Sequence, residues 1–123
     1  MANPDRGEVE VKLGGKMRTM RPTFQGLREV EHRTGLGVIE LVQRFGEGKA
    51  SLDHVAIVLA IGLRAANDDA PDYDQIGEML MRQGMSDVLL PILVFLASAF
   101  VGDQAKNLLA SRGKGAKASP GGA

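Results

Sequence analysis

Residues 8–22, which read EVEVKLGGKMRTMRP, decide the fold of this chain. Charged and apolar residues alternate from residue 8 to residue 13, which is typical of a strand with one buried face and one exposed face. Gly14 and Gly15 then supply the two positive-φ positions that a two-residue hairpin turn needs. We therefore predict an antiparallel hairpin of residues 8–13 and 16–21.

The turn also fixes which residues of the two strands face each other. The predicted pairs are Leu13 with Lys16, Val11 with Arg18 and Val9 with Met20. Met17 falls on the opposite, outer face of the hairpin. A lone hairpin is only marginally stable in water, so this one must pack on other elements.

After Pro22 the apolar residues recur at helical spacing, and the caps divide the chain into helical segments. Thr23, Ser51 and Asp72 are suitable N-caps for the first, third and fourth of them. The fifth opens near Ser86, and Pro91 leaves two alternatives: the main helix begins at residue 90, or a one-turn entry is kinked. The predicted fold class is α+β, mainly α, with an N-terminal hairpin packed on a bundle of four or five short helices.

A chain of 123 residues has room for one domain around one core. We predict a loose lead-in at 1–6, a single domain over 7–112, and a Gly/Lys/Ala-rich tail at 113–123 whose composition cannot form a core. The run from residue 52 to residue 63 is apolar on nearly every side and predicts the central helix. The predicted core contains Val11, Phe24, Leu27, Val38, Leu41, Val58, Leu59, Ile76, Leu80, Leu93 and Leu96.

The composition argues against several classes of partner. Fifteen basic and fifteen acidic residues cancel, so the chain lacks the basic bias of nucleic-acid-binding proteins. The chain has no cysteine, which agrees with a reducing compartment, and no secretion signal is recognisable. Its longest apolar run, at 88–101, is shorter than the roughly 20 residues of a membrane span. We expect a cytoplasmic protein that binds neither nucleic acid nor a membrane.

No group of residues predicts catalysis. His32 and His54 lie in different helices, without the second histidine that a metal site needs three or four residues away. Ser51, Asp53 and His54 have the residue types of a hydrolytic triad, but neighbours in one helical turn point in divergent directions, so capping explains them better. The aspartates of 68–74 lack the spacing of a calcium loop. We expect no enzymatic activity, no cofactor and no metal.

Methionine is the one unusual feature that remains. Met79, Met81 and Met85 lie in or just after the predicted fourth helix, and Met17 lies on the hairpin. Methionine fills irregular gaps in cores, and exposed methionine also suits the binding of apolar helices of varied sequence, so both interpretations stay open. Met81 lies off the apolar face of its helix and is the best candidate for exposure. If there is a partner-binding surface, we expect it near these four residues.

The order and spacing of several short motifs carry a resemblance to a known family. The motifs are GEVEV at 7–11, LGG at 13–15, RPTF at 21–24, the segment 29–35 that ends in Thr-Gly, the helical segments 36–45 and 51–63, and LLP at 89–91. This arrangement resembles the gene-transfer-agent tail assembly protein family, phage-type tail assembly chaperones that have also been labelled phage tail tube proteins. The resemblance extends over about residues 7 to 102 and includes no catalytic signature.

The resemblance implies a chaperone whose partner is the long helical tape-measure protein, kept soluble until tube subunits polymerise around it. The alternative is a structural component of the tail. A tube subunit that assembles through sheets needs many strands, and the sequence predicts one hairpin, which favours the chaperone. A free-standing regulatory binding module also stays open.

Overall fold

Two strands and five helices follow one another in the computed structural model, which describes residues 7–101. They are β1 (Val9–Leu13), β2 (Lys16–Met20), α1 (Phe24–Thr34), α2 (Val38–Gly46), α3 (Leu52–Ala66), α4 (Tyr73–Gln83) and α5 (Ser86–Val101). The predicted α+β, mainly α class is confirmed. The predicted lead-in at 1–6, the last part of the predicted domain at 102–112 and the tail at 113–123 lie outside the described residues.

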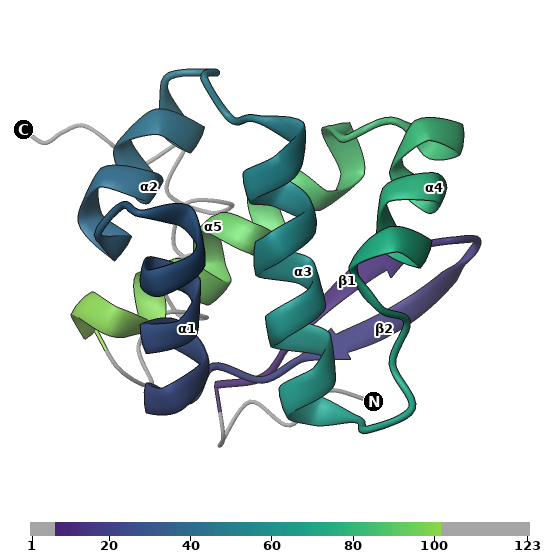
Figure 1. The fold of residues 1–123 in the computed structure, drawn as a ribbon, viewed down its shortest axis with the longest axis horizontal. Coiled ribbons are helices and arrows are strands. Elements are labelled where there is room, and N and C mark those ends of the chain that lie inside the picture. The colour runs from purple at the N-terminus through teal and green to yellow at the C-terminus, as the bar shows by residue number, and fades with distance from the viewer. Residues whose placement is uncertain (1–6, 102–123) are drawn as a thin grey trace, which may run out of the picture.

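β1 and β2 form an antiparallel hairpin with the predicted register. Gly14 and Gly15 have φ angles of 67° and 84°, the left-handed conformation that the two-residue turn requires. Figure 1 shows the hairpin lying along one side of the helices, where β2 packs against α3 and β1 against α5. The inner row of the hairpin, which is buried, consists of Val9, Val11, Leu13 and Met20.

An ion pair fixes the open end of the hairpin. Arg21 Nε lies 3.0 Å from Glu8 Oε2, and the backbone N–H of Arg21 donates a 3.0 Å hydrogen bond to the carbonyl of Gly62 in α3. The alternating pattern predicts an exposed Glu8, whereas the structure starts β1 at Val9 and buries Glu8. The charge of the Arg21 guanidinium makes that burial tolerable.

α3 is the central helix, as predicted. Figure 1 places it between α1 on one side and α4 with the hairpin on the other, and every residue from 55 to 63 is buried. The side chain of Ser51 accepts a 3.0 Å hydrogen bond from the His54 backbone N–H, so the predicted cap is present. Gly62 lies against Phe95 and Met20, whose atoms come within 3.0 and 3.1 Å of where a Cβ on this glycine would be.

The prediction of Phe24 in the core is wrong, because its side chain is 78% exposed and lies under the guanidinium of Arg28. α1 contacts α3 through Gly26, where an added Cβ would be 3.3 Å from Ile61, and Val30 on the same helix is fully buried. Phe24 is two residues from Gly26, which is about 200° around a helix, so it faces away from α3. Leu27 and Leu93 are partly buried against the core, and the other predicted core residues are buried.

α4 and α5 begin differently. Asp72 and Gln75 form a full capping box at the start of α4. α5 begins at Ser86 and continues through Pro91, which matches the predicted opening but not a helix that starts at residue 90. Because proline has no N–H, the carbonyl of Asp87 loses its usual helical donor. Within residues 7–101, no helix is long and apolar enough to cross a membrane.

Candidate functional site

The three methionines of the α4 region differ in exposure. Met81 is 71% exposed, as predicted, whereas Met79 and Met85 are partly buried against the core. The sulfur of Met79 fills the gap between α4 and the hairpin turn, since a Cβ on Gly14 would come within 2.7 Å of it. Met79 therefore serves in packing, and Met81 remains the methionine that is available to a partner.

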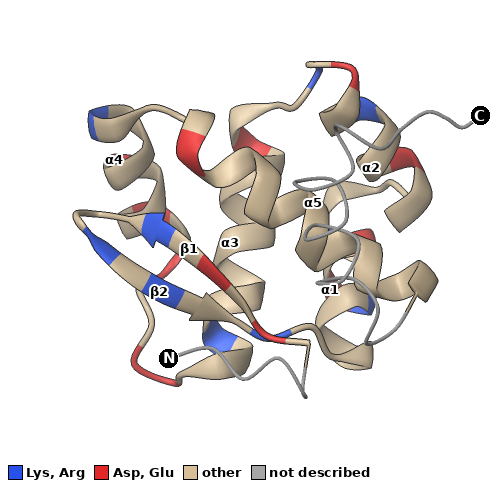
Figure 2. Ribbon diagram, turned by 180° about the vertical axis from the view of Figure 1, so that it is seen from behind, with Lys and Arg blue, Asp and Glu red and all other residues tan. Residues whose placement is uncertain are grey.

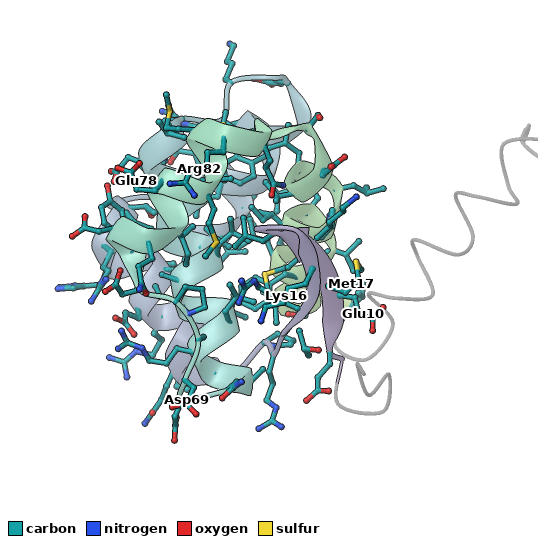
Figure 3. The ribbon with its side chains drawn as sticks, turned by 90° about the vertical axis from the view of Figure 1, so that its right-hand side faces the viewer. Glu10, Lys16, Met17, Asp69, Glu78 and Arg82 are labelled. Carbon is teal, nitrogen blue, oxygen red and sulfur yellow. The ribbon has the colours of Figure 1, made fainter. Side chains whose placement is uncertain are left out.

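Met17 lies elsewhere on the molecule. Its side chain is 57% exposed, and Figure 3 shows it beside Glu10 on the outer face of the hairpin, on the side away from α4. Met17 also borders a hollow of about 580 Å³ between β2 and the segment after α3, which is lined largely by polar and charged residues such as Lys16 and Asp69. The structure thus does not bring Met17 together with Met81.

The side chain of Gln83 makes two hydrogen bonds that set the position of α4 against the hairpin. Gln83 Oε1 accepts a 2.9 Å hydrogen bond from the backbone N–H of Gly14, and Gln83 Nε2 donates a 3.0 Å hydrogen bond to the carbonyl of Lys12. The last turn of α4 is therefore tied to the hairpin turn. This contact joins residues about 70 positions apart in the chain, so no local pattern in the sequence could reveal it.

Met81 lines a shallow hollow of about 460 Å³ between the first turns of α3 and the exposed side of α4. We call this hollow the α3–α4 groove. Its lining consists of Leu52, Asp53 and Ala56 from α3 and of Tyr73, Asp74, Gly77, Glu78 and Met81 from α4.

The apolar lining follows helical spacing. Tyr73, Gly77 and Met81 are four residues apart and form one row along α4, and Leu52 and Ala56 form a matching row on α3. Leu52 is 43% exposed and Tyr73 is 40% exposed, so both of these large side chains are open to solvent. A Cβ on Gly77 would meet nothing within 4 Å. The groove therefore has large side chains around a centre that is open.

The groove is acidic. Asp53, Asp74 and Glu78 line it, no Lys or Arg does, and within residues 7–101 none of the three forms an ion pair. Tyr73 donates a 2.6 Å hydrogen bond to Asp53 Oδ1, which links α4 to α3. This hydrogen bond, with smaller contributions from burial and from the charges of Asp53 and Asp74, raises the pKa of Tyr73 above its usual 10.0. Tyr73 thus stays a donor at neutral pH.

Ser51 and Asp72 act as helix caps, and among residues 7–101 no three His, Asp or Glu side chains converge so as to hold a metal ion. On the face seen in Figure 2, acidic and basic residues are interspersed along the hairpin and the helices. The chemistry that the α3–α4 groove offers is apolar contact within an acidic rim.

Residues 6–102 match the protein family described as phage tail tube protein, GTA-gp10. The chain belongs to this family. No curated protein and no solved structure matches it. The match includes all seven elements of the described fold and the whole α3–α4 groove, and it confirms the family resemblance carried by the sequence motifs.

This member of the GTA-gp10 family is therefore a protein of phage-type tails. The residues that sequence reasoning missed are the partners of Met81 in the groove, above all Leu52, Tyr73 and Gly77. A signal was present in the sequence, because positions 73, 77 and 81 share one side of a helix. What the sequence could not provide was the neighbouring row on α3.

Proposed function

We propose that this GTA-gp10 family member is a tail assembly chaperone that binds apolar helical segments of the tape-measure protein. It keeps those segments soluble until tube subunits polymerise around them. Its role is non-catalytic, requires no cofactor or metal, and is carried out in the cytoplasm, where it binds neither nucleic acid nor a membrane.

The observation that supports this proposal most directly is the exposure of Met81 inside a groove between two helices. An amphipathic helix commonly docks into a groove of this kind, with its apolar side chains covering those of the groove. Methionine suits the task because its flexible thioether adapts to side chains of different shape. The binding surface is centred on Met81, and the exposed part of Met85 extends it.

The second candidate is a structural component of the tail, which the family description as a tail tube protein favours. Tubes that assemble through sheets rely on several strands in each subunit. Residues 7–101 contain one two-stranded hairpin, which offers little sheet for such a wall. This contrast supports the chaperone over the tube subunit.

Co-purification tests the proposal. The tagged protein is co-expressed with the tape-measure protein of the same tail gene cluster, and the two are expected to purify together. Met81→Glu should abolish the association, because it places a charge in the apolar contact. Met17→Glu is the matched control, since Met17 is similarly exposed but lies on the outer face of the hairpin.

Mass spectrometry of purified particles separates the two candidates. A chaperone is expected in the cytoplasmic complex and absent from finished particles. A wild-type protein that fails to bind the tape-measure protein and is abundant in purified tails would refute the chaperone proposal and support the structural one.

A further inference from the structure

We infer that the α3–α4 groove selects one kind of helix: an amphipathic helix with a narrow apolar ridge and with Lys or Arg beside that ridge. This selectivity rests on the proposed function and names the class of segment that the groove accepts. Three features of the groove support it: the glycine at its centre, the apolar side chains around that glycine, and the carboxylates that form no ion pair within residues 7–101.

Gly77 keeps the centre of the groove open. Glycine inside a helix is about 1 kcal/mol less favourable than alanine. Nothing within the described residues requires a glycine here, because its φ is not positive and an added Cβ would meet nothing within 4 Å. The missing side chain allows a second helix to approach the backbone of α4 closely, since interaxial distance depends on the side chains at the contact.

The apolar side chains set the shape of the occupant. Leu52, Tyr73 and Met81 are large, exposed and arranged around the small pair Gly77 and Ala56. A ridge of side chains that enters above the small pair would cover all three large ones at once. Such a ridge is what residues four apart on one face of a helix present, so the occupant is helical.

The carboxylates set the charge of the occupant. Asp74 and Glu78 are four residues apart on α4, where like charges destabilise a helix. Among residues 7–101 neither of them forms an ion pair, and Asp53 accepts only the Tyr73 hydroxyl. Lys or Arg beside the apolar ridge would relieve this repulsion. Binding should therefore weaken as salt concentration rises, although the net charge of the chain is zero.

Two synthetic helical peptides test the selectivity. Both carry the same leucine and alanine ridge, and one is flanked by lysine whereas its twin is flanked by glutamate. Fluorescence anisotropy should show the lysine peptide binding the full chain at least tenfold more tightly than the twin. The double variant Asp74→Asn/Glu78→Gln should weaken the lysine peptide about threefold to tenfold, as expected for two exposed charges.

A matched control separates the groove from overall charge. Asp68→Asn/Asp69→Asn changes the net charge by the same amount, and neither residue lines the groove. This control should leave the affinity within about twofold, because the substituted charges lie outside the site and are screened. Equal weakening by the two double variants would overturn the inference.

Gly77→Leu tests the shape of the groove. Leucine is a much better helix former than glycine, so the variant should melt no lower than wild type while its side chain fills the groove. We expect it to lose the lysine peptide completely. A folded Gly77→Leu protein that binds the peptide as wild type does would contradict the proposed site.

Co-purification of the tape-measure protein distinguishes this inference from the proposed function. If wild type and Gly77→Leu both retain the tape-measure protein, the chaperone proposal stands and the groove is the wrong surface. If wild type does not retain it but the lysine peptide still depends on Gly77, the groove inference stands and the chaperone proposal falls.

Discussion

The same substitution, glycine to alanine, should have opposite effects at two helix-interior positions of this protein. Gly62→Ala should destabilise the fold, whereas Gly77→Ala should stabilise it. At Gly77 an added Cβ meets nothing within 4 Å, but at Gly62 it would lie 3.0 Å from the ring of Phe95 and 3.1 Å from Met20. Phe95 and Met20 are fully buried, so neither can move aside freely.

The magnitude follows from two contributions. Alanine is favoured over glycine inside a helix by about 1 kcal/mol, and both variants gain this equally. Gly62→Ala also forces extra volume into a packed core, which costs about 1 to 3 kcal/mol. Because the helix contribution cancels, the difference between the two variants measures the packing penalty. Gly77→Ala should gain about 1 kcal/mol, and Gly62→Ala should lose up to about 2 kcal/mol.

Urea unfolding followed by circular dichroism measures both variants, with the slope of the transition as a check that the unfolded state is unchanged. In thermal melts each kcal/mol corresponds to about 4 to 8 °C for a domain of this size. If the two variants agree within about 0.5 kcal/mol, the core around Gly62 is not as tightly packed as these distances imply.

Three further expectations concern the core, the groove and the C-terminal tail. Leu59→Ala should lower the free energy of unfolding by about 2 to 5 kcal/mol in the same urea assay, because Leu59 is fully buried in α3. A loss below about 0.5 kcal/mol would mean that α3 is not central. Tyr73 is the chain's one tyrosine and there is no tryptophan, so phenolate absorbance reports its pKa, which should lie above 10.0 and fall in Asp53→Asn. Since folding raises this pKa, the stability that the Tyr73–Asp53 hydrogen bond contributes is present below pH 10.0 and is lost as pH rises through the raised pKa. A Tyr73 titration curve that is unchanged by Asp53→Asn would contradict the assigned cause of the shift. Deletion of residues 113–123 should leave the melting temperature unchanged, because their composition cannot repay the entropy of ordering, and a drop of several degrees would show that the tail is docked.

The hairpin could be predicted almost residue by residue because its information is local. The alternation of residues 8–13 fixes the buried face, and Gly14 with Gly15 fixes the turn, so the register follows without knowledge of the rest of the chain. The caps of α1, α3 and α4 were predictable for the same reason, since a capping side chain acts within three residues.

Errors arose where the outcome depends on which side of an element meets its neighbour. The spacing of Phe24, Leu27 and Val30 fits an apolar helix face, but α1 turns the side with Gly26 and Val30 toward α3. Glu8 is buried although the alternation places it on the exposed face, because Arg21 at the same open end of the hairpin pairs with it. Neither fact is encoded in a pattern of apolar spacing.

Only part of the α3–α4 groove could be predicted from the sequence. The exposure of Met81 followed from its position on the wheel of α4, whereas its neighbour Leu52 belongs to α3 and lies 29 residues earlier in the chain (81 − 52). The tie between Gln83 and the hairpin turn, which holds α4 in place, is more distant still. A surface assembled from several elements becomes visible only when the packing of those elements is known.

The packing of β1 against α5 has a consequence for biosynthesis. Synthesis proceeds from the N-terminus, so the first strand emerges from the ribosome long before the last described helix that covers it. The apolar row of Val9, Val11 and Leu13 is fully shielded from solvent only after residues 86–101 have been synthesised. A nascent chain that stalls before Ser86 would therefore expose the apolar face of the hairpin and be prone to aggregation, because the described domain closes only after α5 has been synthesised.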